Sequence, residues 1–241
     1  MNGRRLIPGK PLPASEVPDY DVVRDTLEES PSPRFASRLR RLNEIVVNSG
    51  EALEGNIFYP NNYALIATEP PSERLAAARR NAWRAARYKR RFLEVGVNAG
   101  HSALLALSCN PELTYYGVDL NEHAYTETCL NYLKSEFPGR VEFFPGNSLD
   151  VLPALVARRA NFNFDLFHVD GGHTSEVCAS DVAHCIRLAA GRLGGHLMID
   201  DTNASWIFDI VCQHVARGDL TVETFFNDWE EAGHNLLARI L

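Results

Sequence analysis

The chain has 241 residues, 45% of them hydrophobic, which is enough for one α/β domain with a substantial core but too little for two full domains. A formal net charge of -7 disfavours a broad nucleic-acid surface, and no apolar run reaches the roughly 20 residues of a membrane span. The five cysteines are scattered, without a CxxC pair, and are most simply buried thiols. Because the N-terminal residues also lack the apolar core of a signal peptide, we expect a soluble, cytoplasmic protein.

Residues 1–70 are expected to form an N-terminal arm or cap and a possible lid, and residues 71–241 the main domain. The first thirty or so residues are rich in proline and acid, and a helix is predicted over residues 34–48. The aromatic stretch after it is interrupted by Gly, Pro and Asn, which favours a loop or short hairpin that could overlie a site. Such an arm is compatible with a homodimer.

The rest of the chain predicts an α/β fold with a doubly wound, mostly parallel, seven-stranded Rossmann-like sheet and helices on both faces. A helix expected over residues 71–90 is followed by short β-rich runs that alternate with helical stretches. In such sheets ligands bind beyond the carboxyl ends of the strands. The predicted strands are residues 91–97, 114–120, 141–146, 164–170, 196–201, 221–227 and 235–241.

The stretch EVGVNAGHS lies between the first of these strands and the helix after it. Gly96 permits a tight turn and close approach of a ligand, Gly100 lets the helix pack on the strand, and Ser102 offers a hydroxyl near free helix N–H groups. The dinucleotide pattern GxGxxG is broken because Asn98 stands where its middle glycine belongs, so NAD is disfavoured. Asp119, at the end of the next strand, is placed to accept hydrogen bonds from a ribose diol.

Two later stretches, FHVDGGHTSE and GGHLMIDDTN, place carboxylates at the ends of buried strands. Asp170 and Asp200 lie one strand-helix-strand unit apart, and Asp201 follows directly, so they should meet at one sheet edge. Clustered carboxylates repel one another unless a cation or a proton intervenes, and an oxygen-only ligand set favours a hard ion such as Mg²⁺. His173, three residues after Asp170, has a pKa suited to removing a proton near neutral pH and is the candidate general base.

These elements together resemble the class I S-adenosylmethionine-dependent methyltransferases. The resemblance implies a donor site in which the glycine loop surrounds the methionine and ribose, Asp119 holds the ribose, and the residues after the third strand lie near the adenine. The family often has Asp at position 147, where this chain has Asn. The implied donor-binding residues are Glu94, Gly96, Asn98, Gly100, Ser102, Asp119, Leu120, Asn147, Ser148 and Asp170.

The DGxH pattern, followed by a helix and a strand ending in DD, resembles a narrower branch, the metal-dependent small-molecule O-methyltransferases, which includes macrolide-sugar enzymes. That resemblance implies Mg²⁺ ligation by Asp170 with Asp200 or Asp201, His173 as general base, and methyl transfer to a hydroxyl of a sugar, polyol or catechol-like molecule, as in natural-product biosynthesis. Asp181 also fits the branch pattern, although it could equally be a charge on a helix surface.

Three rival functions stay open at this stage. A nucleic-acid methyltransferase is disfavoured because VDGG stands where the amino-methylating enzymes resemble one another in an Asn/Asp-Pro-Pro-aromatic motif. A nonenzymatic subunit that kept the donor fold would leave the acid and histidine cluster unexplained. A metal-dependent hydroxylase-like relative would consume oxygen instead of forming methylated product. The acceptor cannot be read from the sequence, since the loop aromatics Phe58, Tyr59, Tyr63 and Trp206 more often anchor packing than line a pocket.

Overall fold

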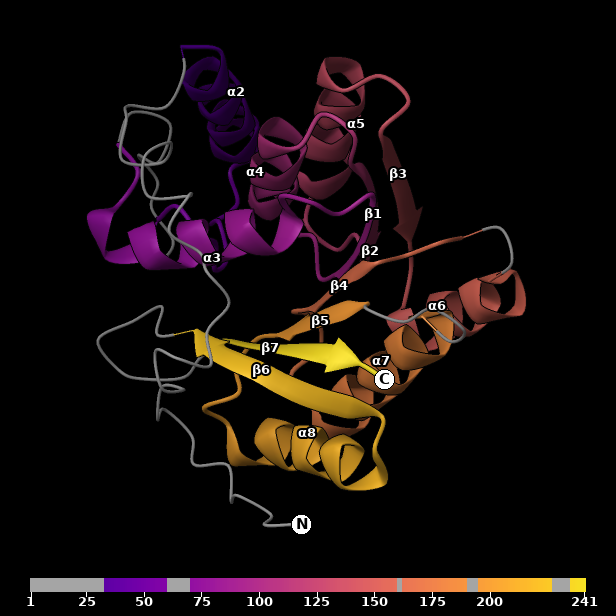
Figure 1. Cartoon of the computed structure of the whole chain (residues 1–241). Helices are drawn as coiled ribbons and strands as arrows, with labels where there is room; N and C mark the ends of the chain where they lie inside the picture. Colours follow the sequence, from indigo (N-terminus) through magenta and orange to yellow (C-terminus); the bar gives the residue numbers. More distant parts are fainter. Residues whose placement is uncertain (1–32, 60–69, 160–161, 190–194, 227–234) are drawn as a thin grey trace.

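The computed structural model describes residues 33–59, 70–159, 162–189, 195–226 and 235–241. Seven strands within these ranges form one sheet in the order β3-β2-β1-β4-β5-β7-β6 (Figure 1). Strands β1 to β5 pair in parallel, and β7 runs antiparallel to both β5 and β6. The predicted doubly wound, mostly parallel sheet is therefore confirmed. The expected arm over residues 1–32 and residues 60–69 of the expected lid lie outside the described residues.

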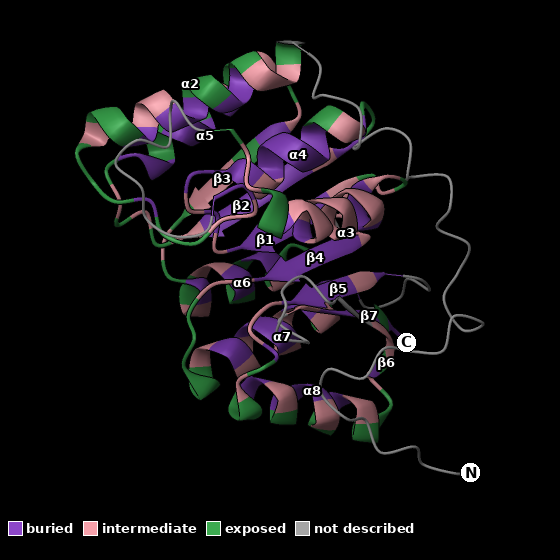
Figure 2. Ribbon diagram, turned by 90° about the vertical axis from the view of Figure 1, so that its left-hand side faces the viewer, coloured by how far each residue is buried: buried purple, intermediate pink, exposed green. Residues whose placement is uncertain are grey.

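The strands begin and end within two residues of their predicted limits. Their apolar runs are bounded by glycine, proline or acid, which stop a strand clearly, and the central strands are buried on both faces as parallel strands are (Figure 2). The bounds are β1 (Arg91–Val95), β2 (Thr114–Asp119), β3 (Val141–Pro145), β4 (Leu166–Val169), β5 (His196–Ile199), β6 (Leu220–Phe226) and β7 (Asn235–Ile240).

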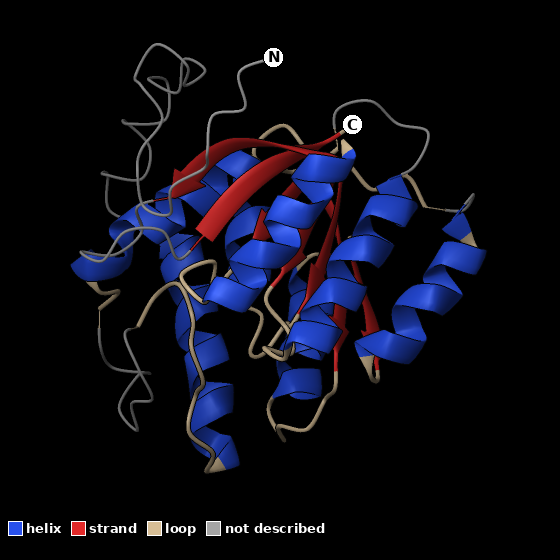
Figure 3. Cartoon of the chain, turned by 90° about the horizontal axis from the view of Figure 1, so that it is seen from below, coloured by secondary structure: helices blue, strands red, loops and turns tan. Residues whose placement is uncertain are grey.

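Helices cover both faces of the sheet, and Figure 3 shows the strands enclosed between them. Two buried apolar clusters result, one on each face, so the sheet lies between two hydrophobic cores. Helices α2 (Pro33–Ser49), α3 (Ala76–Ala86), α4 (His101–Cys109) and α5 (Thr126–Glu136) contribute to the first cluster, and α6 (Ser148–Ala157), α7 (Ser175–Ala189) and α8 (Ser205–Arg217) to the second.

The helix expected over residues 71–90 is shorter than predicted. A 3₁₀ turn, η4 (Glu73–Leu75), precedes α3, and α3 ends at Ala86. The Asn110 side chain donates hydrogen bonds to the Ala86 and Lys89 carbonyl oxygens at 3.0 and 2.6 Å, so a residue from beyond α4 takes up carbonyls that another turn of helix would otherwise use.

The five cysteines are free thiols. Cys129, Cys178 and Cys185 are buried as predicted, whereas Cys109 and Cys212 are only partly buried. None of the helices in the described part of the chain is both long and apolar enough to cross a membrane.

Candidate active site

A pocket of about 680 Å³ lies at the carboxyl edge of the sheet, where the loops after β1 to β5 converge. This volume is in the range of small-molecule sites. The segment 54–57 and helix α3 form its other walls. The pocket brings together most of the predicted site residues: Gly96, Asn98, Ser102, Asp119, Leu120, Asn147, Ser148, Asp170, His173, Asp200 and Asp201.

The turn after β1 is held by Asp119. One carboxylate oxygen accepts hydrogen bonds from the Val97 and Asn98 N–H groups at 2.8 and 3.0 Å, and the other accepts from Asn121 N–H at 2.8 Å. An ionised carboxylate accepts about four hydrogen bonds. Asp119 therefore keeps acceptor capacity for a ligand hydroxyl while its position is fixed by the backbone.

Gly96 brings this turn against the loop after β4. Its φ is +87°, and a Cβ atom built on it would lie 2.0 Å from the Asp170 carbonyl oxygen. Only glycine fits there. The close approach couples the glycine loop directly to the backbone of Asp170.

The Glu94 side chain lies beneath the pocket and does not line it. Its carboxylate is 1% exposed and accepts hydrogen bonds from the Tyr115 hydroxyl, from Ser102 Oγ at 2.7 Å and from His168 Nδ1 at 2.9 Å. Burial, the charge of Glu94 and the hydrogen bond to it raise the pKa of Tyr115 well above its usual value, so Tyr115 stays a donor. The structure thus gives Glu94 an interior role in place of the expected direct contact with a donor. Gly100, at the start of α4, also stays outside the pocket lining.

Asp170 and Asp200 end neighbouring strands side by side, as predicted. Each N–H group continues the strand ladder, at 2.9 Å to Val95 O and 3.0 Å to Val169 O, which places both residues at the same edge. Burial, together with mutual repulsion, raises the pKa of Asp170 well above its usual value; burial and the charge of Asp201 raise that of Asp200. Two carboxylates this close are compatible with a shared proton or a bound cation.

The third member of this cluster is His168, not Asp201. Potential ligand atoms of His168, Asp170 and Asp200 lie within 4.8 Å of one another. Burial lowers the pKa of His168, but the hydrogen bond to Glu94 and the two nearby carboxylates outweigh it and raise that pKa to about 9. The sequence prediction missed His168, although strand alternation places it on the same side of β4 as Asp170, two residues later.

Asp201 turns away from Asp200 and pairs with His173, the expected general base. Asp201 has a φ of +53°, and its carboxylate oxygen lies 2.8 Å from His173 Nδ1. This hydrogen bond raises the pKa of His173. Trp206 Nε1 donates to the His173 carbonyl oxygen at 3.1 Å and so holds the loop.

The segment 54–57 is tied through side chains to the glycine turn after β1. Asn98 Nδ2 donates to the Gly55 carbonyl oxygen at 3.0 Å, and the Tyr125 hydroxyl donates to Asn98 Oδ1 at 2.7 Å. The ring of His123 stacks on Tyr125 and pairs with Glu51 at 3.0 Å. The end of the segment that follows α2 therefore forms part of the site's wall.

The far end of the pocket is partly apolar. Leu120 is 54% exposed there, Asn147 Oδ1 caps α6 by accepting from Leu149 N–H at 3.0 Å, and Ser148 follows it. Asp181 is fully buried behind Gly171 instead of lying on the helix surface, and this burial raises its pKa to about 6.

Of the four aromatics expected in loops, Phe58 and Tyr59 are buried in the core, which favours packing over acceptor binding, and Trp206 lies in the first turn of α8 and not in a loop. Tyr63 lies outside the described residues, and Trp206 is half exposed.

Comparison with known proteins agrees with this architecture. Residues 93–202 match the family model of a methyltransferase domain. No curated protein matches the sequence. Among solved structures, the O-methyltransferase TomG from Streptomyces achromogenes in complex with SAM is 20% identical, with a TM-score of 0.54 over 66% of this chain and 79% of that one.

Two further structures match almost the whole chain. Cofactor-bound Rv0187 from MTB is 19% identical, with a TM-score of 0.59 over 98% of this chain and 99% of that one. The O-methyltransferase from Bacillus cereus in complex with SAH is 14% identical, with a TM-score of 0.59 over 94% and 98% of the two chains. The chain therefore has the Rossmann-like α/β methyltransferase fold.

Proposed function

We propose that this protein is an S-adenosylmethionine-dependent O-methyltransferase that methylates a hydroxyl of a small molecule with the help of a divalent cation. The observation that carries the proposal is that one pocket is lined by two sets of residues with different chemistry. A glycine turn and Asp119 suit a nucleoside donor, while Asp170, Asp200 and the His173–Asp201 pair suit deprotonation of an acceptor. The O-methyltransferases of similar fold that were solved with SAM or SAH support the choice of donor.

The residues that line the donor half of the pocket suit S-adenosylmethionine by their chemistry. Asp119 accepts a hydrogen bond from a ribose hydroxyl, Leu120 offers apolar surface to the adenine, and Asn147 and Ser148 lie at the same end. The pocket's carboxylates suit a sulfonium cation, whose charge disappears when the methyl group leaves.

The acceptor half must align an oxygen and remove its proton. S-adenosylmethionine supplies an already activated methyl group, so positioning and proton removal are the protein's main tasks. Because Asp201 is acceptor-only when ionised, it holds the proton of His173 on Nδ1 and leaves Nε2 as the base. As the new O–C bond forms and the S–C bond breaks, the hydroxyl proton passes to His173 Nε2.

The cluster that includes Asp170 and Asp200 fits a divalent cation, because two ionised carboxylates otherwise repel one another there. Such a cation lowers the pKa of a bound hydroxyl and orients it. Asp170 and Asp200 would hold such a cation, and both line the same pocket as His173.

Donor binding is tested first, by thermal unfolding with S-adenosylhomocysteine and, separately, with NAD. We expect stabilisation by S-adenosylhomocysteine alone; stabilisation by NAD alone would reject the donor. A panel of sugars, catechols and other polyols with labelled donor then identifies the acceptor class, with oxygen consumption followed in parallel to detect hydroxylase chemistry.

The role of His173 is tested with the acceptor found in this way. His173→Ala should lower turnover by about 10²-fold or more, as expected for loss of a general base. His184→Ala serves as the control, because His184 lies on α7 and does not line the pocket. Full activity of His173→Ala would remove His173 from the mechanism.

A further inference from the structure

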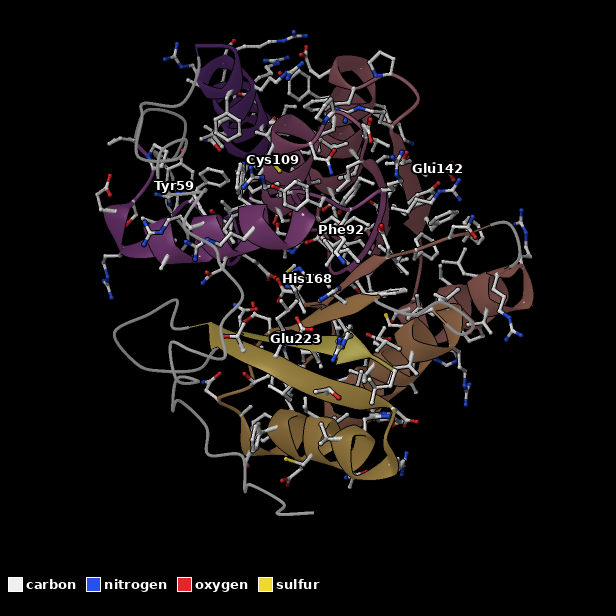
Figure 4. All side chains as sticks on the ribbon, viewed as in Figure 1. Tyr59, Phe92, Cys109, Glu142, His168 and Glu223 are labelled. Atoms are coloured by element: carbon white, nitrogen blue, oxygen red, sulfur yellow. The ribbon has the colours of Figure 1, made fainter. Side chains whose placement is uncertain are left out.

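His168 has one ring nitrogen hydrogen-bonded to Glu94, and a potential ligand atom of its ring lies close to Asp170 and Asp200. It is the third residue of β4 and pairs in register with Glu94 of β1. Its Nδ1 lies 2.9 Å from Glu94 Oε1, and because an ionised carboxylate can only accept, Nδ1 carries the proton. Nε2 is therefore the ring nitrogen that remains available to bind a metal. Figure 4 labels His168, which lies in the middle of the molecule beside the central strands.

Glu94 cannot easily release His168. Its carboxylate is 1% exposed and also accepts from Tyr115 and Ser102, so three donors fix it. His168 itself is 8% exposed. Its imidazole is thus held in one orientation before any ligand arrives, in the arrangement by which a carboxylate orients a metal-binding histidine.

The spacing also fits a shared ion. Ligand atoms of His168, Asp170 and Asp200 lie within 4.8 Å of one another, while no hydrogen bond or ion pair between His168 and either aspartate is found in the described ranges. Bonds from nitrogen or carboxylate oxygen to a small divalent ion are roughly 2.0–2.2 Å long, so one ion can reach all three after small side-chain movements.

We propose that His168 Nε2 is a ligand of the divalent cation, that Glu94 is the positioning residue for it, and that the site therefore prefers Mn²⁺ or Co²⁺ to Mg²⁺. This inference rests on the proposed function only in giving the cation a role, which is to bind and activate the acceptor hydroxyl. An imidazole nitrogen favours transition metals, whereas Mg²⁺ prefers oxygen ligands throughout. The oxygen-only set that led the sequence analysis to Mg²⁺ is replaced by a mixed set of one nitrogen and two carboxylates.

The test measures metal binding on the full chain without donor or acceptor. After removal of metal with EDTA and dialysis, Mn²⁺ is titrated and followed by EPR, and pulsed EPR reports whether a nitrogen is bound directly. Wild-type protein should show nitrogen coupling. His168→Ala should lose it and bind Mn²⁺ at least about 10-fold more weakly, whereas His173→Ala, the matched histidine of the same pocket, should keep it.

Selectivity gives a readout that loss of structure alone would not change. His168→Ala should weaken Co²⁺ binding by a larger factor than Mg²⁺ binding, because only the nitrogen donor is removed. Glu94→Gln should weaken Mn²⁺ binding by about 10- to 100-fold while coupling persists. Tyr115→Phe, which removes a different hydrogen bond from the same carboxylate, should leave Mn²⁺ affinity nearly unchanged. His168→Gln provides a second variant if His168→Ala does not fold.

Three results would overturn the proposal: Mn²⁺ binding without nitrogen coupling, coupling that survives in His168→Ala but is lost in His173→Ala, or no Mn²⁺ binding by folded wild-type protein. A separate titration with S-adenosylhomocysteine tests the proposed methyltransferase function independently of these three results. A protein that binds Mn²⁺ through His168 but not S-adenosylhomocysteine would leave the ligand assignment standing and reject the methyltransferase.

Discussion

Gly96→Ala should damage the fold and the site together. Gly96 has a φ of +87°, and its backbone touches the loop after β4. An added Cβ atom would lie 2.0 Å from the Asp170 carbonyl oxygen and 2.8 Å from Gly171 Cα. Both atoms belong to the backbone directly after the central strand β4, so they cannot move aside as a flexible side chain could.

The size of the effect follows from two separable costs. A left-handed conformation costs an alanine roughly 1–2 kcal/mol. Overpacking against rigid neighbours adds about 1–3 kcal/mol, so we expect a total of about 2–5 kcal/mol. For a chain of this length a loss of 1 kcal/mol lowers the Tm by roughly 2–4 °C, which predicts a fall of about 4–20 °C.

Gly139→Ala is the matched control. Gly139 has a φ of +73°, and nothing lies within 4 Å of the position of its Cβ atom, so only the backbone cost of about 1–2 kcal/mol applies. Thermal unfolding followed by circular dichroism measures both variants, and calorimetry measures their affinity for S-adenosylhomocysteine and Mn²⁺. Gly96→Ala should lose both affinities and Gly139→Ala neither. If Gly96→Ala and Gly139→Ala had equal Tm values and Gly96→Ala bound both ligands as wild type does, the close approach between the glycine turn after β1 and Asp170 would be refuted.

Three further outcomes are expected. Asp201→Asn should lower kcat by up to about 10²-fold and move the acidic limb of the kcat/KM profile to lower pH, because Asp201 raises the pKa of His173 and the base works when neutral; an unshifted limb would contradict this pairing. His123→Gln should cost more stability at pH 6 than at pH 9. Burial lowers the pKa of His123, but Glu51 and Glu54 outweigh burial and raise this pKa overall. The stability that His123 contributes is therefore full below the pKa of the unfolded state and is lost as pH rises through the pKa of the folded state. Equal Tm differences between wild type and His123→Gln at the two pH values would contradict this prediction. EDTA should abolish methyl transfer but leave S-adenosylhomocysteine affinity largely intact, and unchanged turnover would reject the cation.

The strands were predictable because their limits are local. Apolar runs that end at glycine, proline or aspartate carry their own stop signals, and β1 to β5 follow them closely. The end of α3 was not predictable, because Asn110, from beyond the next helix, takes up the carbonyl oxygens of Ala86 and Lys89. Such a contact exists only once the chain has folded.

The candidate site was predictable to the level of the sheet edge but not of the individual ligand. Parallel strands bring Asp170 and Asp200 together regardless of detail. The direction of Asp201 depends on a left-handed φ of +53°, a conformation that few non-glycine residues adopt. With this backbone angle the two adjacent aspartates have different partners: Asp200 lies with His168 and Asp170, and Asp201 pairs with His173.

The place of His168 in the site follows from the register between two buried strands. Leu93 and Val95 of β1, and Phe167 and Val169 of β4, are buried with at most 4% exposure, and they flank the pair of Glu94 and His168 on both sides. A slip of one residue would exchange the two faces of a strand and place these polar side chains in the apolar core on the opposite side. The cost of that burial disfavours a slip of one residue. The apolar residues of β1 and β4 therefore keep Glu94 and His168 on the same face of the sheet, and the observed register places the two side by side.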